Sequence, residues 1–189
     1  MNNFRIVDLK PEDTQLIQQT AQLSLEASQS ISKIWLPTLE DALEEVHDSL
    51  EEEDGISWVL MDNDTVVAWI GAFPMFGKIV EIHPLLVHMT YQNQGLGRRL
   101  VTDVTTWARQ QGALTLFLST SDETNATSFS LPGINLYENP AEAIANFYQV
   151  KSHPCGFWLK MGFHIVGVLP DAEAKGMPSL QMAKPLHNH

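Results

Sequence analysis

A glycine-rich turn between an apolar segment and an amphipathic segment restricts the fold of this chain more than any other feature. Residues 90–100 read TYQNQGLGRRL, in which Gly95 and Gly97 stand one residue apart. The segment before the turn, residues 79–89, has the composition of a strand, and the residues after it repeat apolar side chains at helical spacing. The sequence therefore predicts a strand, a tight turn and a helix, in that order.

Such a turn is suited to binding a phosphate or pyrophosphate group. The first amides of a helix lack intrahelical acceptors and lie at the positive end of the helix dipole, so they attract anions. Arg98 and Arg99 stand at the mouth of the turn and can add charge-assisted hydrogen bonds. The alternative is that the glycines only permit a tight connection. The spacing matches neither G-x-x-x-x-G-K-[ST] nor G-x-G-x-x-G, which excludes those two nucleotide-binding loops.

The rest of the chain predicts a mixed α/β (α+β) fold in a single domain over residues 1–189. Pro84 interrupts the expected strand 79–89 and marks an edge or a bulge, because proline donates no hydrogen bond to a ladder. The polar stretch 121–135 is long enough to be a functional or mobile loop. Strands are expected at 4–9, 56–61, 65–72, 79–89, 113–120, 163–169 and 180–184, helices at 11–28, 39–54, 96–111, 141–150 and 153–162, and a second loop at 170–177.

The charge of the chain is strongly acidic and unevenly distributed. Its 189 residues include 11 basic and 23 acidic side chains, which gives a formal net charge of −12. Nucleic acid is not expected as a partner, because phosphate neutralisation needs clustered Lys and Arg. A cationic ligand would be attracted, although a solvated helix face that keeps the protein soluble explains the same pattern. Eleven acids and no Lys or Arg lie between Lys33 and Lys78: Glu40, Asp41, Glu44, Glu45, Asp48, Glu51, Glu52, Glu53, Asp54, Asp62 and Asp64.

Composition predicts a cytoplasmic protein without a membrane span or a metal site. The sequence is 44% hydrophobic, enough for a sizeable core, yet it has no run of 18 apolar residues that would predict a span. The first residues lack the charged and apolar regions of a signal peptide. Cys155 is the only cysteine, so no internal disulfide is expected and an ordinary thiol is predicted there. The 7 histidines lack ligand spacing, and no metal is predicted.

Two motifs and several shorter segments resemble a known enzyme family. Residues 92–97, QNQGLG, match Q/R-x-x-G-x-G/A and resemble the acetyl-CoA pyrophosphate loop of the GNAT N-acetyltransferases. FWLKMGF at 157–163 resembles the family segment F-Y-x-K-x-G-F. Segments between residues 56 and 184 resemble one branch, the aminoglycoside 6'-N-acetyltransferases and their uncharacterised relatives: IGAFP at 70–74, EIHPLLV at 81–87, NLYE at 135–138, HP at 153–154, IVGVLPDA at 165–172 and MAK at 182–184.

The resemblance implies a fold, a co-substrate and a set of cofactor contacts. The fold is the GNAT acyl-CoA N-acyltransferase fold, with a mixed central sheet of six to seven strands flanked by helices, and the co-substrate is acetyl-CoA. By resemblance, the pantetheine arm lies along the strand after Pro84, where the Val87 or Met89 amide faces the thioester oxygen. The pyrophosphate lies on the amides of residues 94–99. The implied cofactor-binding residues are Leu86, Val87, His88, Met89, Gln92, Gln94, Gly95, Leu96, Gly97, Arg98, Arg99 and Trp158.

Candidate catalytic residues lie on the strand before the turn. Glu81 and His83 are two residues apart and so share one face of a strand, where either can accept the proton of an amine. The resemblance favours Glu81. The alternatives are a structural histidine and a surface acid. Trp158 stands where many relatives have tyrosine, and an indole N–H is a donor but not a practical acid, so no general acid is assigned. Tyr137 and Tyr148 are substitutes or packing residues.

The acceptor is expected to be a primary amine of a small polycationic molecule, attacked directly in a ternary complex. An aminoglycoside, acetylated at its 6'-amine in an antibiotic-resistance reaction, is the leading candidate. A polyamine, another metabolite amine or a peptide N-terminus is the alternative. An acetyl-CoA-binding sensor with little catalysis is the alternative from another class. A homodimer is a weak expectation from the resemblance. The predicted acceptor-binding residues are Trp35, Glu40, Asp41, Glu81 and Asp171.

Overall fold

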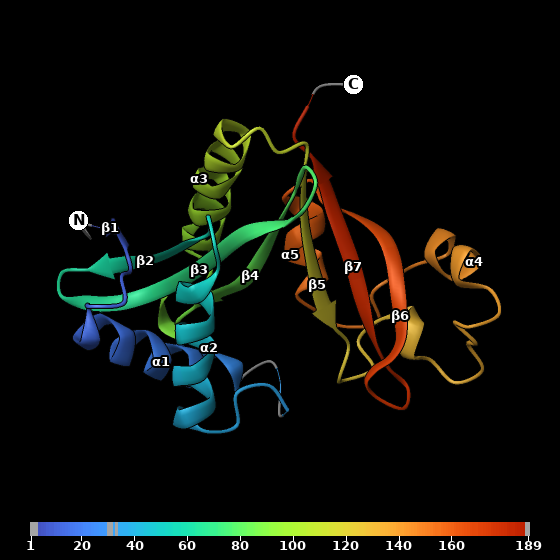
Figure 1. Ribbon diagram of the computed structural model, residues 1–189. Helices are drawn as coiled ribbons and strands as arrows, with labels where there is room; N and C mark the ends of the chain where they lie inside the picture. The colour runs from blue at the N-terminus through green and yellow to red at the C-terminus, as the bar shows by residue number, and fades with distance from the viewer. Residues whose placement is uncertain (1–3, 30–31, 33, 188–189) are drawn as a thin grey trace. The chain divides into compact units, whose positions relative to one another are not determined.

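The computed structural model describes residues 4–29, 32 and 34–187. It divides into two compact units, Met1–Ala113 and Leu114–His189 (Figure 1). The described residues contain seven strands, four in the first unit and three in the second, together with helices in both. The predicted mixture of helices and strands is therefore confirmed. No helix within these described ranges is both long and apolar enough to cross a membrane.

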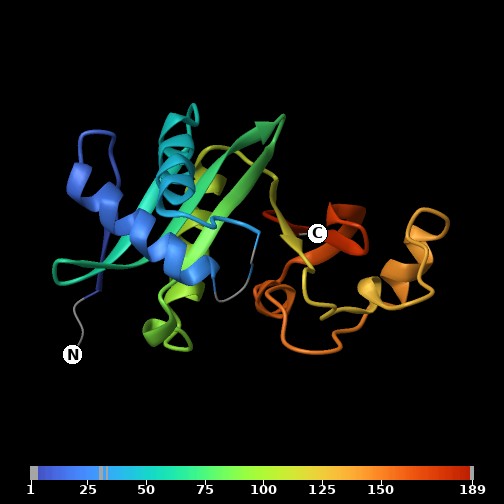
Figure 2. The same cartoon turned by 90° about the horizontal axis from the view of Figure 1, so that it is seen from below.

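The first unit is built on an antiparallel sheet in the order β1-β2-β3-β4. Helices α1 and α2 cover one face and α3 lies on the other (Figures 1 and 2). Because both faces are covered, β3 is buried throughout residues 66–72. The elements are β1 (Phe4–Asp8), α1 (Thr14–Ser28), α2 (Leu39–Glu51), β2 (Ile56–Asp62), β3 (Thr65–Phe76), β4 (Ile79–Val87), the 3-10 helix η1 (Met89–Tyr91) and α3 (Leu96–Gln110).

The ends of α1 and α2 follow from local hydrogen bonds. Helix α1 begins at Thr14 rather than at residue 11, because Pro11 and Glu12 form a turn closed by the bond from the Asp13 amide to the Lys10 carbonyl, 3.0 Å. Helix α2 begins with a capping box. The Thr38 hydroxyl accepts a hydrogen bond from the Asp41 amide at 3.2 Å, and the Asp41 carboxylate accepts one from the Thr38 amide at 3.0 Å.

A bulge interrupts the pairing of β3 with β4. Ile70 pairs with Leu85 and Ala72 with Ile82, so two residues, His83 and Pro84, stand opposite Gly71 alone. An added Cβ at Gly71 would overlap the carbonyl oxygen of His83, so only glycine permits this close approach. The bulge predicted from Pro84 is therefore confirmed. The expected end of the preceding strand at residue 72 is wrong, because the hairpin continues in exposed residues to 76.

The second unit is a three-stranded antiparallel sheet in the order β5-β7-β6. The expected loop 170–177 is wrong: β6 runs on past an irregularity in pairing after Leu169, and a turn at Lys175 and Gly176 leads into β7. The expected helix 141–150 ends early, because the Val150 amide bonds to the Ala126 carbonyl at 2.8 Å. The elements are β5 (Thr115–Ser121), the 3-10 helix η2 (Ser128–Ser130), α4 (Pro140–Ala145), α5 (Cys155–Lys160), β6 (His164–Ala174) and β7 (Met177–Pro185).

The polar stretch after β5 is organised around one buried carboxylate. Asp122 is fully buried and accepts hydrogen bonds from the Ala126 amide, the Thr127 amide and the Thr127 hydroxyl, each at 2.8 Å, and from the Ser130 hydroxyl at 2.7 Å. Burial by itself would raise the pKa of Asp122, but these hydrogen bonds more than offset it, and the pKa is lowered. The stretch is therefore a tightly hydrogen-bonded turn around a charged group.

Replacing Gly71 with alanine should destabilise the first unit. The new methyl group meets backbone rather than a movable side chain, so overpacking should reduce the free energy of unfolding by about 1–3 kcal/mol. Urea denaturation measures this. Gly167→Ala is the matched control, because a Cβ there meets the Gln181 side chain, which can turn away. Equal losses in the two variants would contradict the role given to the bulge.

Replacing Asp122 with asparagine should destabilise the second unit by about 2 kcal/mol or more at pH 7, since bonds to a charged acceptor are lost. A depressed pKa contributes stability above the unfolded value, near 3.8, and loses it as pH falls through the folded pKa. The difference between wild type and variant should therefore shrink below about pH 3.8. Urea denaturation at several pH values tests this, with the exposed Glu138→Gln as control. A difference that does not change with pH would contradict it.

Candidate active site

The turn between β4 and α3 has the geometry of an anion site. Gly95 precedes α3 with φ +83°, in the left-handed region, and an added Cβ there would meet open space. The Arg99 amide bonds to the Gly95 carbonyl at 3.0 Å. The three amides before it have no acceptor within the helix, and Gly95 offers no side chain to cap them. The positive end of α3 is therefore open to a bound anion.

Side chains of the loop itself fix this turn. Gln92 donates from Nε2 to the Val87 carbonyl at 3.1 Å, and Gln94 does so to the Thr90 carbonyl at 3.0 Å. Both were predicted as cofactor contacts; the structure shows their amide groups shaping the loop. Arg99 donates to the Phe4 carbonyl at 3.1 Å and lies 4.0 Å from Asp103. Arg98 is exposed and has no ion pair within the described part of the chain.

Of the backbone amides predicted to contact the cofactor, the amide of Val87 points away from β3. The His88 amide donates to the Val67 carbonyl of β3 at 3.0 Å. Because successive amides of a strand point to opposite edges, the Val87 amide faces away from β3. Met89 lies in η1, so the strand expected up to residue 89 ends two residues earlier and this alternation does not reach Met89. The Leu86 and Leu96 side chains are core residues, with 3% and 5% exposure.

Beside the bulge, β4 and α2 bring together an imidazole and several carboxylates. His83 Nε2 lies 2.8 Å from Glu45 Oε1 of α2, and the two side chains are 48% and 17% exposed. The Trp35 ring lies 5.9 Å from the His83 ring, centroid to centroid. Glu81 lies two residues before His83 on β4. The structure therefore places three predicted site residues, Trp35, Glu81 and His83, at one end of the first unit.

Glu45 is a member of this group that the sequence did not single out. It was counted only among the eleven acids before Lys78. A signal was present, because Ala42 and Val46 on the buried face of α2 flank it at helical spacing, which puts position 45 at the edge of that face. No local sequence pattern predicts that α2 brings Glu45 close to His83 of β4. Two predicted acceptor acids stand apart: Glu40 is exposed, and Asp41 is held in the capping box.

Burial and charge set the protonation of Glu81 and His83. The pKa of Glu81 is raised, chiefly by burial and further by the negative charge of Glu52, while His83 acts to lower it. Burial would lower the pKa of His83, but the hydrogen bond to Glu45 and the charges of Glu45, Glu81 and Glu52 outweigh it and the pKa is raised. Glu81 is therefore a stronger base than an exposed carboxylate, and His83 holds its proton more firmly than a free imidazole.

The predicted site residues of the second unit have separate surroundings. Trp158 is buried and packs edge-on against Phe157 and Phe163, at 5.0 and 5.1 Å between centroids, so it is a core residue of that unit. Its contact with a cofactor stays a prediction. Asp171 accepts hydrogen bonds from the Tyr137 hydroxyl at 3.1 Å and the Gly176 amide at 2.6 Å.

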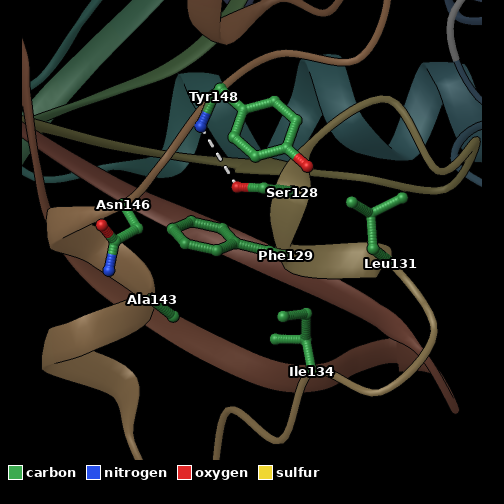
Figure 3. Close-up of a pocket in the computed structure, with 7 residues that line it drawn as sticks. All are labelled: Ser128, Phe129, Leu131, Ile134, Ala143, Asn146 and Tyr148. Atoms are coloured by element: carbon green, nitrogen blue, oxygen red, sulfur yellow. Dashed lines mark hydrogen bonds between the residues drawn. The ribbon is translucent and has the colours of Figure 1, made fainter.

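The two tyrosines named as substitute acids line separate cavities of the second unit, and Tyr137 is poorly suited to donate a proton. The hydrogen bond to Asp171 raises the pKa of Tyr137, which makes it a weaker acid. Tyr137 and Asp171 line a cavity of about 260 Å³. Tyr148 lines a smaller cavity of about 120 Å³ whose walls are mostly apolar, and its amide is held by the Ser128 hydroxyl at 3.1 Å (Figure 3). The leaving thiolate therefore has no assigned acid among the described residues.

Cys155 is the buried, inert thiol that the sequence predicts. It has no exposed surface, and burial, followed by the charge of Asp122, raises its pKa to about 11. The His153 ring lies between two backbone groups: Nδ1 accepts from the Cys155 amide at 3.1 Å, and Nε2 lies 3.0 Å from the Ser121 carbonyl, to which it donates. These bonds describe a neutral imidazole that holds the backbone, so cysteine, histidine and aspartate do not form a nucleophilic triad here.

Comparison with known proteins identifies the family of this chain. Residues 18–139 match the model of the acetyltransferase (GNAT) family, which is more than half of the chain. The chain belongs to the GNAT acetyltransferase family. None of the curated proteins matches the sequence significantly. The family and its fold confirm the predicted fold class and the predicted acetyl-CoA-dependent N-acetyltransferase activity.

Solved structures similar over nearly the whole chain include several aminoglycoside acetyltransferases. An aminoglycoside 6'-N-acetyltransferase complexed with coenzyme A is 28% identical, with 98% of each chain covered and a TM-score of 0.86. The aminoglycoside 6'-N-acetyltransferase from Enterococcus faecium is also 28% identical, with the same coverage and a TM-score of 0.83. The ribosomal-protein-S18-alanine N-acetyltransferase from Escherichia coli, at 16% identity and a TM-score of 0.63, shares the fold alone.

Replacing Gly95 with alanine should weaken coenzyme A binding. A side chain at φ +83° is strained, so the loop should shift and misalign the free amides of α3. We expect the Kd for coenzyme A, measured by calorimetry, to rise about tenfold, which corresponds to ~1.4 kcal/mol. Gly77→Ala is the matched control, because Gly77 also has positive φ and open space around it but lies in the β3–β4 turn. A similar loss of affinity in both variants would contradict the assignment of the anion site.

Proposed function

We propose that this protein transfers acetyl from acetyl-CoA to the 6'-amine of an aminoglycoside, a reaction that confers antibiotic resistance. The observation that carries the proposal is the group of Glu81, His83, Glu45 and Trp35: Glu81 has a raised pKa, and His83, two residues further along β4, lies beside the Glu45 carboxylate and the Trp35 ring. The full-length similarity to aminoglycoside 6'-N-acetyltransferases at 28% identity supports the same acceptor. The proposed acetyltransferase domain is the whole chain, residues 1–189.

In the proposed reaction the acceptor amine attacks the thioester carbonyl directly. An alkylammonium titrates near ~10 and has no lone pair, so it must first lose a proton, which Glu81 accepts. The amine then attacks the thioester carbonyl, and the new C–N bond gives a tetrahedral oxyanion that the Val87 amide, directed away from β3, can stabilise. The oxyanion collapses with cleavage of the C–S bond, and the nitrogen releases its second proton to solvent. The thiolate of coenzyme A departs without a protein acid and takes its proton from solvent. His83, whose raised pKa favours the protonated form, takes no proton in this scheme.

The amides at the start of α3 would hold the pyrophosphate of the co-substrate. Gly95 precedes this helix end, and Gly97 and Arg98 lie in its first turn. The exposed guanidinium of Arg98 can approach the phosphates. Binding both substrates side by side supplies much of the rate enhancement, because it replaces a collision of two molecules by a reaction within one complex. Backbone groups therefore do most of the cofactor binding in this proposal.

Acidic side chains are suited to the acceptor because an aminoglycoside carries several ammonium groups. Carboxylates bind such groups through charge-assisted hydrogen bonds. Trp35 can pack against the apolar face of a sugar ring or attract its ammonium groups. Asp171 lines a cavity of the second unit, and its contact with the acceptor stays a prediction from the sequence. Glu40 and Asp41 are proposed only as part of the attracting charge.

A thiol-release assay tests the acceptor. We expect turnover on an aminoglycoside with a 6'-amine and none on one whose 6' position carries a hydroxyl. Glu81→Gln should lower kcat/KM by about a hundredfold, the lower range for loss of a general base. Because the pKa of Glu81 is raised, the acidic limb of the wild-type kcat/KM profile should lie above pH 4.5. Glu53→Gln, an exposed acid of the same segment, is the control and should retain full activity.

The outcomes separate the candidate acceptors. Turnover only on polyamines, other small amines or peptide N-termini would keep the acetyl transfer and overturn the aminoglycoside assignment. Full activity of Glu81→Gln on an aminoglycoside would keep the acceptor and overturn the proposed base.

A further inference from the structure

Glu45 and His83 form a close contact between a largely buried carboxylate and an imidazole, which is more than a solvated surface acid would make. The Glu45 carboxylate is only 17% exposed and lies 2.8 Å from His83 Nε2. It is the single member of the acidic series on α2 whose carboxylate reaches β4 among the described residues. A largely buried carboxylate needs a partner, and the imidazole provides a charge-assisted one.

The His83 side chain is held from two further directions. The Trp35 ring lies 5.9 Å away, a separation at which an aromatic ring attracts a cation. The bulge opposite Gly71 fixes the backbone of His83, because strands β3 and β4 approach closely there. The imidazole is therefore held between α2 and the indole ring, with Nε2 directed at Glu45.

All charged groups around His83 favour its protonated form. Glu45 acts from α2 by hydrogen bond and charge, Glu52 acts from the C-terminal end of α2, and Glu81 acts from β4 itself. Trp35 is uncharged, and Gly71 of β3 has no side chain. No positive charge opposes this set among the groups that act on His83 in the described structure. The protonated imidazole in turn lowers the pKa of Glu81, which burial raises.

We propose that Glu45 is a positioning residue for acetyl transfer: it holds the His83 imidazole in its charged form against α2, so that Glu81 alone accepts the proton of the acceptor amine. This inference rests on the proposed function. Glu45 itself touches no substrate in the proposal. Its effect passes through His83, which keeps Glu81 ionised at pH values where a half-buried carboxylate would otherwise bind a proton.

The charge state of His83 can be measured without any substrate. The full chain is labelled at its histidines and titrated by NMR, and His83→Gln assigns the signal. We expect the wild-type midpoint to lie above 6.5 and to fall in Glu45→Gln, because the hydrogen bond and the charge of Glu45 are lost. Glu44→Gln is the matched control, since it removes an exposed charge from the same helix, and it should leave the midpoint in place. An equal midpoint in wild type and Glu45→Gln overturns the inference.

Stability should follow the same titration. A pKa that is raised in the folded state stabilises the protein below the unfolded value, near 6.5, and this stability is lost as pH rises through the folded pKa. Glu45→Gln should therefore lower the melting temperature at pH 6 and have little effect at pH 9. A loss of equal size at both pH values would indicate a packing role only and would overturn the inference.

Kinetics provide the readout on the reaction. Glu45→Gln should move the acidic limb of the kcat/KM profile for the acceptor to higher pH, because a less protonated His83 lowers the pKa of Glu81 less. KM for acetyl-CoA should stay unchanged, and the substitution should have no further effect in a His83→Gln background. Additive shifts in the double variant overturn the inference. If the protein acetylates no amine but the His83 midpoint behaves as expected, the proposed function fails and the ion pair stands. If Glu45→Gln does not fold, a wild-type midpoint at or below 6.5 overturns the inference alone.

Discussion

The irregular pairing of β3 with β4 is the constraint on which the candidate active site depends. Two residues of β4, His83 and Pro84, stand opposite Gly71, and the missing side chain of Gly71 lets the two backbones approach. The bulge bends β4 where its outward residues meet α2. His83 therefore faces the helix that carries Glu45, with Glu81 two residues before it on the strand. The strand regains regular pairing at Leu85, and the Val87 amide faces away from β3.

The two chemical tasks of the site fall to different kinds of group. In the proposed reaction, coenzyme binding depends on backbone amides at the start of α3, while the nearby Gln92 and Gln94 side chains shape the loop. Proton transfer in that proposal depends on side chains whose pKa values shift in a common acidic environment. Coenzyme binding needs only glycines and a helix end, so it is visible in the sequence as a short motif. Proton transfer needs side chains from separate elements, and no short motif contains them.

This difference explains what could be predicted from the sequence. Periodicity and glycine placement predicted β4, α3 and the turn between them, and Pro84 predicted the bulge. Periodicity failed for β6, whose exposed end, PDAEA at 170–174, consists of residues that are depleted in strands, and for α4, whose end is decided by pairing with a distant segment. Glu81 and His83 were found because they share one strand. Glu45 was missed because its partner lies 38 positions away, at a helix crossing that no local pattern encodes.

The sequence of α2 has a consequence for how the first unit responds to a cation. The helix begins with Glu40 and Asp41, which suit the positive end of its dipole, but it ends in acids and has no basic residue in its last turn. The free protein thus keeps mutual repulsion at the C-terminal end of α2, which His83 relieves only when it is protonated. A polycation bound there would relieve that repulsion, so its binding would be thermodynamically linked to thermal stability through one helix end. An acidic surface of this kind gives up some resting stability in exchange for affinity toward positively charged molecules.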